Sequence, residues 1–450
     1  MTTATAEQTH DDLTDPPAPA PAWHPVALLA FRFTVAYLGL FCVWMAQITF
    51  VFAGWFTTVL PQEAVVWQIR ALEPVSGWLG EHVFGVDAEV VMTGSGDLAA
   101  IWIQLGLVLV AALVITAVWS VLDRRRRAYP WLAAWALTGL RLAVGGQMLF
   151  YGFNKLIPLQ MPEPGLLTLI SRVGDLSPMG MLWTQVGSSP AYQIALGAAE
   201  VLAGMLLFWP RTATLGAMLS VISMAQVFLL NLTFDVPVKI LSGHLLLMSL
   251  VLLAPQARRL VNVLVLERDS APMTQPALFT APRANRWATG VQLALCLWIT
   301  AGLVVMGVES WHEYGGGAPK PELYGIWDVT EYTVGTETLP PLTTDPVRWQ
   351  RLIVDTGGSV VQHMDGRVVP VLTTLDPDTH TLTVIPAAGQ PDSPPIATFA
   401  VDRPTEDRLL LRGDLAGAPG AVSLTRFDHE SLPLRGTGFH WVQNAPNSGG

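Results

Sequence analysis

The sequence predicts an α-helical polytopic membrane protein of about seven spans, with a four-helix bundle at its centre and a C-terminal all-β domain, either a barrel or a sandwich. Two observations indicate the membrane class. The chain of 450 residues is 51% hydrophobic and only 13% charged, and its mean hydropathy is +0.43, whereas a soluble domain carries about a quarter charged residues. A third observation indicates the β-domain, because short alternating apolar runs replace the long ones after residue 308.

Charge and cysteine content exclude several classes of function. The net charge is −10 and no basic domain is visible, so we expect no nucleic-acid partner. Cys42 and Cys296 are the two cysteines, both lie in apolar runs, and the chain has no C-x-x-C motif. We therefore expect two buried thiols, with no zinc site, no other metal site and no covalently bound cofactor.

Seven apolar runs are long enough to span a bilayer, which takes about 20 residues. Residues 1–25 precede them as a polar, acidic, Pro/Ala-rich tail that we expect to be disordered. Segment 26–129 contains two spans joined by an amphipathic stretch, 61–98, expected on the extracytoplasmic membrane surface. The expected spans are 27–51, 99–122, 131–153, 191–209, 212–233, 237–254 and 287–308.

Arginines predict the orientation of these spans. They follow the second span, separate the fourth from the fifth, and fill the loop 257–286 between the sixth and seventh: Arg124 to Arg127, Arg211, Arg258, Arg259, Arg268, Arg283 and Arg286. With seven spans and a cytoplasmic N-terminus, all of these lie in the cytoplasm, as the positive-inside rule requires. The sequence thus predicts a protein of the cytoplasmic membrane, embedded in its lipid bilayer, whose C-terminal domain is extracytoplasmic.

Two spans carry polar stripes that we expect to face each other. In the stretch RLAVGGQMLFYGFNKLIP, Arg141 and Lys155 share one helix face with spaced glycines, and Glu200 shares a face with glycines on the next span. Because an intramembrane charge needs a partner, we expect Arg141 to neutralise Glu200 and Lys155 to reach water at the outer end. A structural ion pair and a working site both remain open.

Further polar residues extend the candidate ligand site. Asp235 and Lys239 lie at i, i+4 near the outer end of the bundle, and Gln147 and His244 lie within spans. With Arg141, Lys155 and Glu200, they are candidates for binding an anionic or quinone-like head group; solvation alone is the alternative. Haem is not expected, because His244 is the one histidine inside a confident span.

The segments RLAVGGQMLFYGFNKL and GAAEVLAGMLLFWPRTATLGAML carry a resemblance to the DoxX family of bacterial membrane proteins. The matching positions include Arg141, Gly152, Lys155, Glu200 and the Arg211-Thr212 pair. The resemblance implies that residues 130–256 form a four-helix membrane bundle and that the protein is a membrane component of a redox system. Since no protein-bound redox centre is recognisable, that role requires a quinone or a partner subunit.

A Gly/Pro linker, 309–321, leads into the β-domain, 322–450. About eight short strands are expected, with a tight hairpin at Asp365-Gly366 and longer turns at Asp376-Pro377-Asp378 and PDSPP. Gly325-Ile326-Trp327 resembles the G-x-W that opens a lipocalin-like barrel, which implies that Arg435 packs over Trp327. An ordinary core tryptophan is the alternative. Such a domain binds a small apolar ligand or docks an extracytoplasmic partner protein.

Three functions follow from this sequence. The first is a quinone- or lipid-linked component of a membrane oxidoreductase, using the bundle cluster. The second is a non-enzymatic anchor whose β-domain binds a partner or an apolar ligand. The third is a transporter that uses Arg141 and Glu200, which no internal repeat supports.

Overall fold

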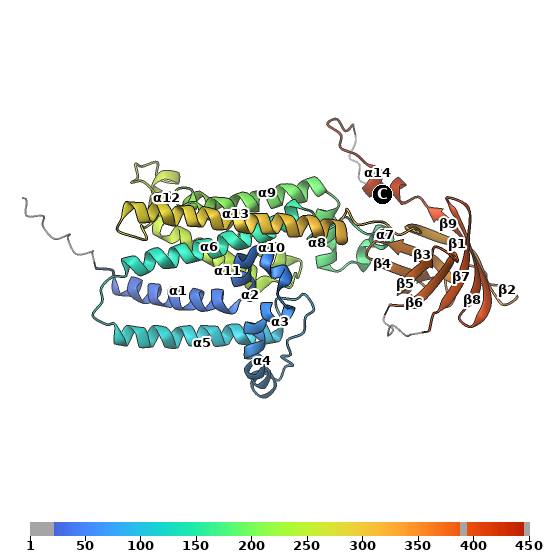
Figure 1. Ribbon diagram of the computed structural model, residues 1–450, viewed down its shortest axis with the longest axis horizontal. Coiled ribbons are helices and arrows are strands. Elements are labelled where there is room, and N and C mark those ends of the chain that lie inside the picture. The colour runs from blue at the N-terminus through green and yellow to red at the C-terminus, as the bar shows by residue number, and fades with distance from the viewer. Residues whose placement is uncertain (1–21, 388–393, 445–450) are drawn as a thin grey trace, which may run out of the picture. The chain divides into compact units, whose positions relative to one another are not determined.

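The computed structural model describes residues 22–387 and 394–444. The expected tail, 1–25, therefore lies almost wholly outside the described residues. The chain forms two compact units: Met1–Gln147, Met205–Val221 and Ile240–Leu297 make the first, and Met148–Gly204, Ile222–Lys239 and Trp298–Gly450 make the second. Figure 1 labels the helices and strands of both units.

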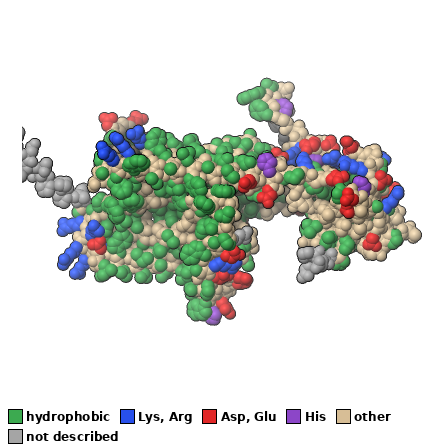
Figure 2. Space-filling model, in the orientation of Figure 1, with side chains coloured by type: hydrophobic (Ala, Val, Ile, Leu, Met, Phe, Trp, Pro, Cys, Tyr) green, Lys and Arg blue, Asp and Glu red, His purple; other side chains and the backbone are tan. Residues whose placement is uncertain are grey.

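Membrane-spanning helices dominate the first 313 residues. Within the described residues, six helices are long and apolar enough to cross a bilayer: α1 (Pro25–Trp44), α5 (Ala99–Leu122), α9 (Pro190–Phe208), α10 (Ala213–Thr233), α11 (Lys239–Leu253) with its continuation to Leu264, and α13 (Pro282–Glu313). Apolar side chains cover these helices (Figure 2), and more than half of the surface of Leu113 and Val114 on α5 is exposed. An apolar surface of this size is unfavourable in water, whereas the hydrocarbon chains of lipids solvate it.

Helix α6 (Pro130–Leu156) occupies the place of the expected span 131–153. Its 27 residues are enough to cross a bilayer. It does not belong to the six strongly apolar helices, because Arg141, Gln147 and Lys155 interrupt its apolar sequence. The predicted class of membrane helices followed by a β-domain is confirmed, with six strongly apolar helices and one polar-striped helix in place of seven similar spans.

The first span is shorter than the sequence suggested. Helix α1 ends at Trp44 because Met45 adopts an extended conformation, and the chain then forms α2 (Ala46–Phe50) and the 3-10 segment η1 (Val51–Val59). Gly54, at a φ of 56°, kinks η1. The helix expected over 27–51 therefore ends early, at Trp44; the apolar run itself continues to Leu60, so the sequence left this end of the span open.

Short helices complete the helical part. They connect the long helices or follow them, and they are α3 (Gln62–Val65), α4 (Trp67–Leu79), η2 (Gly80–Phe84), α7 (Leu166–Ile170), η3 (Val173–Asp175), α8 (Pro178–Gly187), η4 (Ala254–Gln256) and α12 (Ala257–Leu264). In the first unit, Gln104 of α5 accepts a hydrogen bond from the Trp44 indole at 3.0 Å and donates to the Ser76 hydroxyl at 3.2 Å. These bonds join α1, α4 and α5.

The C-terminal domain is a closed antiparallel barrel, so the barrel alternative was right and the sandwich was not. Its strands are β1 (Gly325–Val334), β3 (Trp349–Asp355), β4 (Gly358–His363), β5 (Val368–Asp376), β6 (Thr381–Pro386), β7 (Ala397–Thr405), β8 (Arg408–Leu415) and β9 (Ala418–Phe427), with the two-residue β2 (Glu337–Thr338) outside the closed ring. Neighbours in sequence pair in order and β1 pairs with β9, so the ring leaves few free strand edges.

The inside of the barrel is a hydrophobic core. Alternate residues of the strands point inward, and the large ones include Trp327, Tyr332, Trp349 and Phe399, all at most 4% exposed. The Trp327 indole donates to the Leu323 carbonyl at 2.8 Å, which satisfies its polar atom. Trp327 is therefore a core tryptophan of the barrel.

Turns at the positions predicted from the sequence connect consecutive strands of the barrel. Gly366, at a φ of 88°, follows Asp365 between β4 and β5, as the Asp-Gly signal predicted. The Asp376-Pro377-Asp378 turn joins β5 to β6, and the Asp376 carboxylate caps the Asp378 amide at 2.9 Å. The PDSPP turn lies partly outside the described residues.

Within the second unit, the segment after α6 is bound to the barrel. Leu166, which begins α7, packs with Ile326 and Ile353 in a buried cluster, and its amide donates to the Asp355 carboxylate at 2.7 Å. Past β9, the short helix α14 (Pro433–Gly436) follows η5 (His429–Ser431). Buried apolar contact and a charge-assisted bond together make this attachment firm.

We expect Phe399→Ala to destabilise the barrel by about 3–5 kcal/mol, because it leaves a cavity in the buried core. Leu372→Ala, at a side chain that is 55% exposed on the same barrel, serves as the matched control and should change little. Thermal unfolding of the full chain, followed by tryptophan fluorescence and limited proteolysis, measures both. Equal effects would contradict this assignment of the core.

A pH dependence follows from Tyr332. Burial, assisted by the charge of Asp345 and opposed by that of Arg348, raises the pKa of the Tyr332 hydroxyl above its ordinary value of 10.0. The raised pKa contributes stability that is complete below pH 10.0 and is lost as pH rises towards the folded-state pKa. Barrel unfolding should therefore become easier above this pH, and Tyr332→Phe should flatten the curve. The same slope in both proteins would refute the assignment.

Candidate functional site

The candidate site in the second unit is an ion pair between α6 and α9. Lys155 Nζ lies 3.0 Å from Glu200 Oε1 and 2.7 Å from Oε2. The two side chains are 6% and 4% exposed. The prediction that Arg141 pairs with Glu200 was therefore wrong, and so was the prediction that Lys155 reaches water.

Helix geometry explains the exchange of partners. Arg141 precedes Lys155 by 14 residues, so the two lie about 21 Å apart along α6 at 1.5 Å per residue. Glu200 lies at the level of Lys155, with which it pairs. Both cations share a helix face, so spacing alone could not decide which one meets the carboxylate.

Two glycines bring α6 and α9 together beside the ion pair. A Cβ on Gly152 would lie 2.7 Å from the amide nitrogen of Val201, and a Cβ on Gly197 would lie 2.6 Å from the carbonyl oxygen of Gly152. No side chain fits there, so the backbones touch. Lys155 follows Gly152, and Glu200 follows Gly197, by three residues each, which places both side chains in the contact.

The surroundings of the pair are partly polar. The Lys155 ammonium lies 5.7 Å from the centre of the Tyr151 ring. Two helical turns before Glu200, the fully buried Gln193 of α9 exchanges hydrogen bonds with the backbone amide and carbonyl of Met161 when its carboxamide is oriented to satisfy both. The arrangement can bind a polar head group, hold a proton, or serve as structure.

The remaining candidates of the second unit form a separate, exposed pair. Asp235 and Lys239 are joined at 2.9 Å, with the Asp235 side chain 84% exposed. Their bond is an i, i+4 contact at the start of α11, of the kind that contributes little at a surface. They therefore extend the site less than the sequence suggested.

Three candidates belong to the first unit. Arg141, 3% exposed, donates to the Gln292 carboxamide of α13. Gln147 donates to the Gln47 carbonyl at 2.9 Å and accepts from the Gln47 side chain at 3.1 Å. Both contacts join helices through buried polar groups.

His244 contacts α1 within the first unit. Its Nε2 lies 2.8 Å from the Tyr37 hydroxyl, its Nδ1 lies 2.7 Å from the Ile240 carbonyl, and its ring stacks on Phe41 at 3.9 Å. Both ring nitrogens have partners. The histidine thus links α11 to α1, consistent with a structural role.

The expected packing of Arg435 over Trp327 does not form. Arg435 lies in α14, past the last strand, and it donates to the Glu163 carboxylate at 2.5 Å and to the Pro164 carbonyl at 3.1 Å. The Arg403 guanidinium lies over the Trp327 ring at 6.0 Å from its centre, and Arg426 of β9 is the cross-strand neighbour of Trp327. Because β9 ends at Phe427, the chain between it and Arg435 carries the arginine away from the ring.

Partners such as Gln47, Gln292 and Tyr37 did not emerge from the sequence. Gln47 and Gln292 lie in expected spans, where an uncharged polar residue already signals a need for a partner. Because these residues are uncharged, the pattern of charges alone does not identify them.

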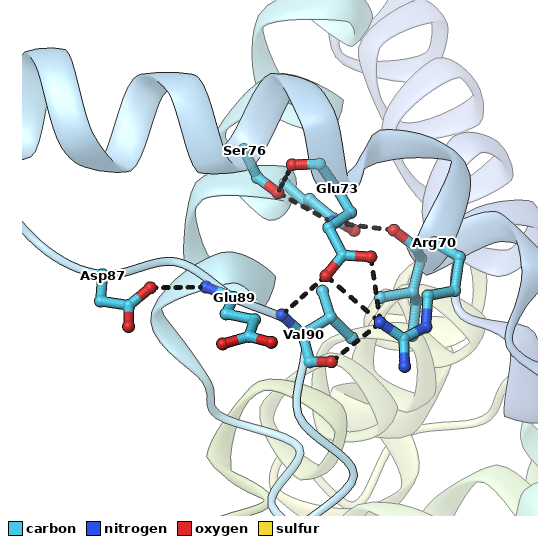
Figure 3. Close-up of polar contacts among 8 residues, drawn as sticks. Arg70, Glu73, Ser76, Asp87, Glu89 and Val90 are labelled. Carbon is cyan, nitrogen blue, oxygen red and sulfur yellow. Dashed lines mark hydrogen bonds and ion pairs between the residues drawn. The ribbon is translucent and has the colours of Figure 1, made fainter.

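The first unit also contains an open acidic cleft of about 640 Å³ at α4 and η2. Figure 3 shows Glu73 accepting from Arg70, at 3.0 Å, and from the Val90 amide, at 3.1 Å. Burial tends to raise the pKa of the Glu73 carboxyl, but these two hydrogen bonds and the charge of Arg70 outweigh it and lower the pKa. Over residues 22–387 and 394–444, no group of three His, Cys, Asp or Glu side chains suits a metal ion.

No family model matches the chain, and no solved structure matches it. The chain is similar to an uncharacterized protein, YwoB, of Bacillus subtilis (strain 168), with 38% identity over 81 residues. The matched part is 18% of this chain and 53% of YwoB, so the chain spans about half the length of that relative.

We expect Glu200→Gln to cost about 3–5 kcal/mol of stability, because it leaves the Lys155 charge buried without an anion. The double variant Lys155→Met, Glu200→Leu should restore most of the loss, since no charge then remains. Asp235→Asn, which breaks the exposed pair, is the matched control. Thermal unfolding in mild detergent measures all three; a Glu200→Gln variant as stable as the control would show that the pair is not buried.

Proposed function

We propose that the protein is a DoxX-like membrane component of a quinone- or lipid-linked redox system, with its candidate site at the Lys155–Glu200 pair. The observation that carries this proposal is the burial of a complete ion pair between two helices of a membrane protein. Ionisable residues within spanning helices are costly and commonly mark ligand or proton pathways. The DoxX resemblance of residues 130–256 supports the same assignment.

The donor set suits a quinone head group. An ammonium has three N–H donors, and Lys155 directs Nζ at two oxygens of Glu200, which leaves one donor for a head-group carbonyl oxygen. Glu200 holds the Lys155 side chain in place through both of its carboxylate oxygens. A bound quinone would supply the electron chemistry, and a partner subunit would supply or receive the electrons.

Arginine positions support an orientation for this proposal. With α6 counted as a span, the arginines after α5, between α9 and α10, and between α11 and α13 all fall on one side of the membrane. The positive-inside rule makes that side the cytoplasm. The N-terminus is then cytoplasmic, in a cytoplasmic membrane, and the barrel is extracytoplasmic.

A second candidate function is a membrane anchor whose barrel binds a partner protein. It is favoured by the attachment of the barrel to the segment after α6, through Leu166 to Asp355 and Glu163 to Arg435. The aromatic core inside the barrel favours recognition by its outer surface over capture of an apolar ligand in its interior.

The discriminating experiment is solvent extraction of the purified protein, with quinones identified by absorbance and mass spectrometry. We expect quinone in the wild type and in Asp235→Asn, and its loss from the double variant Glu200→Gln, Lys155→Ala, because that variant lacks both charged groups of the site. Equal quinone in every protein, or none in the wild type, would refute the redox proposal and leave the anchor.

A further inference from the structure

The first unit contains a half-open apolar groove between α1, the α2–η1 segment and α6, with a volume of about 380 Å³. Its lining includes Leu38 and Cys42 of α1, Ile48 and Phe52 of the α2–η1 segment, and Ala143 of α6. The volume lies within the range of small-molecule sites. None of the described residues that line the groove carries a charge.

Two glycines on facing helices open the groove. Gly39 of α1 and Gly139 of α6 both line it, and a Cβ built on either residue meets no atom within 4 Å. These glycines differ from Gly152 and Gly197, which allow backbones to touch. Here the missing side chains leave space, because a Cβ at either position would occupy the groove without displacing protein atoms.

One end of the groove is closed by protein. Beyond Ala143, a Cβ on Gly146 would lie 2.8 Å from the Val51 side chain, so α6 and η1 are in contact there. The reciprocal hydrogen bonds of Gln47 and Gln147 join α2 to α6 at the same level. These contacts fix one end of the groove and hold together the helices that form its walls, and binding sites on such rigid elements are well positioned.

We propose that this groove binds one hydrocarbon chain of a membrane lipid. Its helix α1 is a membrane-spanning helix, so the medium at its opening is hydrocarbon. An uncharged apolar lining complements such a chain and penalises ionic ligands. The chain is an acyl chain of a phospholipid, because such acyl chains form the hydrocarbon core of the bilayer at the opening. This proposal does not rest on the redox proposal, because it uses none of the Lys155–Glu200 contacts.

Photo-crosslinking to the full chain in nanodiscs tests the proposal. The probes are a phosphatidylcholine with a diazirine in one acyl chain and a quinone with a diazirine in its isoprenoid chain, and their sites are mapped by peptide mass spectrometry. At low probe density, the phosphatidylcholine probe should label α1 and α6 around the groove, and an excess of unlabelled phosphatidylcholine should compete. Labelling of the groove by the quinone probe alone would overturn the proposal.

Groove-filling variants supply the control. Gly39→Leu and Gly139→Leu should each lower labelling of the groove by about tenfold, the equivalent of 1.4 kcal/mol. Gly139→Ala should have an intermediate effect. Gly106→Leu is the matched control, because Gly106 lies on α5 with open space at its Cβ and does not line the groove.

Labelling is compared only among proteins with wild-type thermal stability, and the alanine variant keeps the test valid if a leucine variant misfolds. Unchanged labelling in the groove-filling variants would overturn the proposal. So would labelling spread evenly over the lipid-facing residues of α1, α5 and α6. The double variant Lys155→Met, Glu200→Leu, which removes both charges and is expected to keep most of the stability, should label as the wild type does, which separates this test from that of the redox proposal.

Discussion

Hydrocarbon cannot solvate a charge, and this constraint governs how polar residues are placed in the helical part of the chain. Lys155 and Glu200 satisfy it with each other, at a point where Gly152 and Gly197 remove the side chains that would separate their helices. Gln147 and His244 satisfy it with neutral partners on other helices. Arg141 satisfies it in part, because its Nη2 donates to Gln292 while its Nη1 has no hydrogen-bond partner among the described residues. The polar residues therefore connect helices pairwise, and apolar side chains are left to face the lipid.

The same constraint shows what the sequence could and could not predict. Spans, the barrel and the Asp365-Gly366 turn follow from local signals, namely run length, alternation and a dipeptide that favours positive φ. Lys155 and Glu200 were identified as candidates because charge is rare in apolar helices. Their pairing could not be predicted, since Arg141 shares a helix face with Lys155. Which of the two cations meets Glu200 depends on how far α9 is shifted along α6, and the sequence does not give that shift.

Arg435 illustrates a second limit. The lipocalin-like pattern places an arginine of the last strand beside the tryptophan of the first strand. Arg435 could take that place only if the last strand extended as far as residue 435, and here β9 ends at Phe427. The arginine instead binds Glu163, a residue far away in the sequence whose partner nothing local specifies. Contacts between distant segments depend on packing, which periodicity does not encode.

The attachment of α7 to the barrel has a consequence for biosynthesis. Leu166 and Asp355 are 189 residues apart in the chain. At a synthesis rate of roughly 5–20 residues per second, the ribosome needs roughly ten to forty seconds to make the strand that covers Leu166 after that residue has been added. During this interval its apolar surface is uncovered while the later spans are still being inserted.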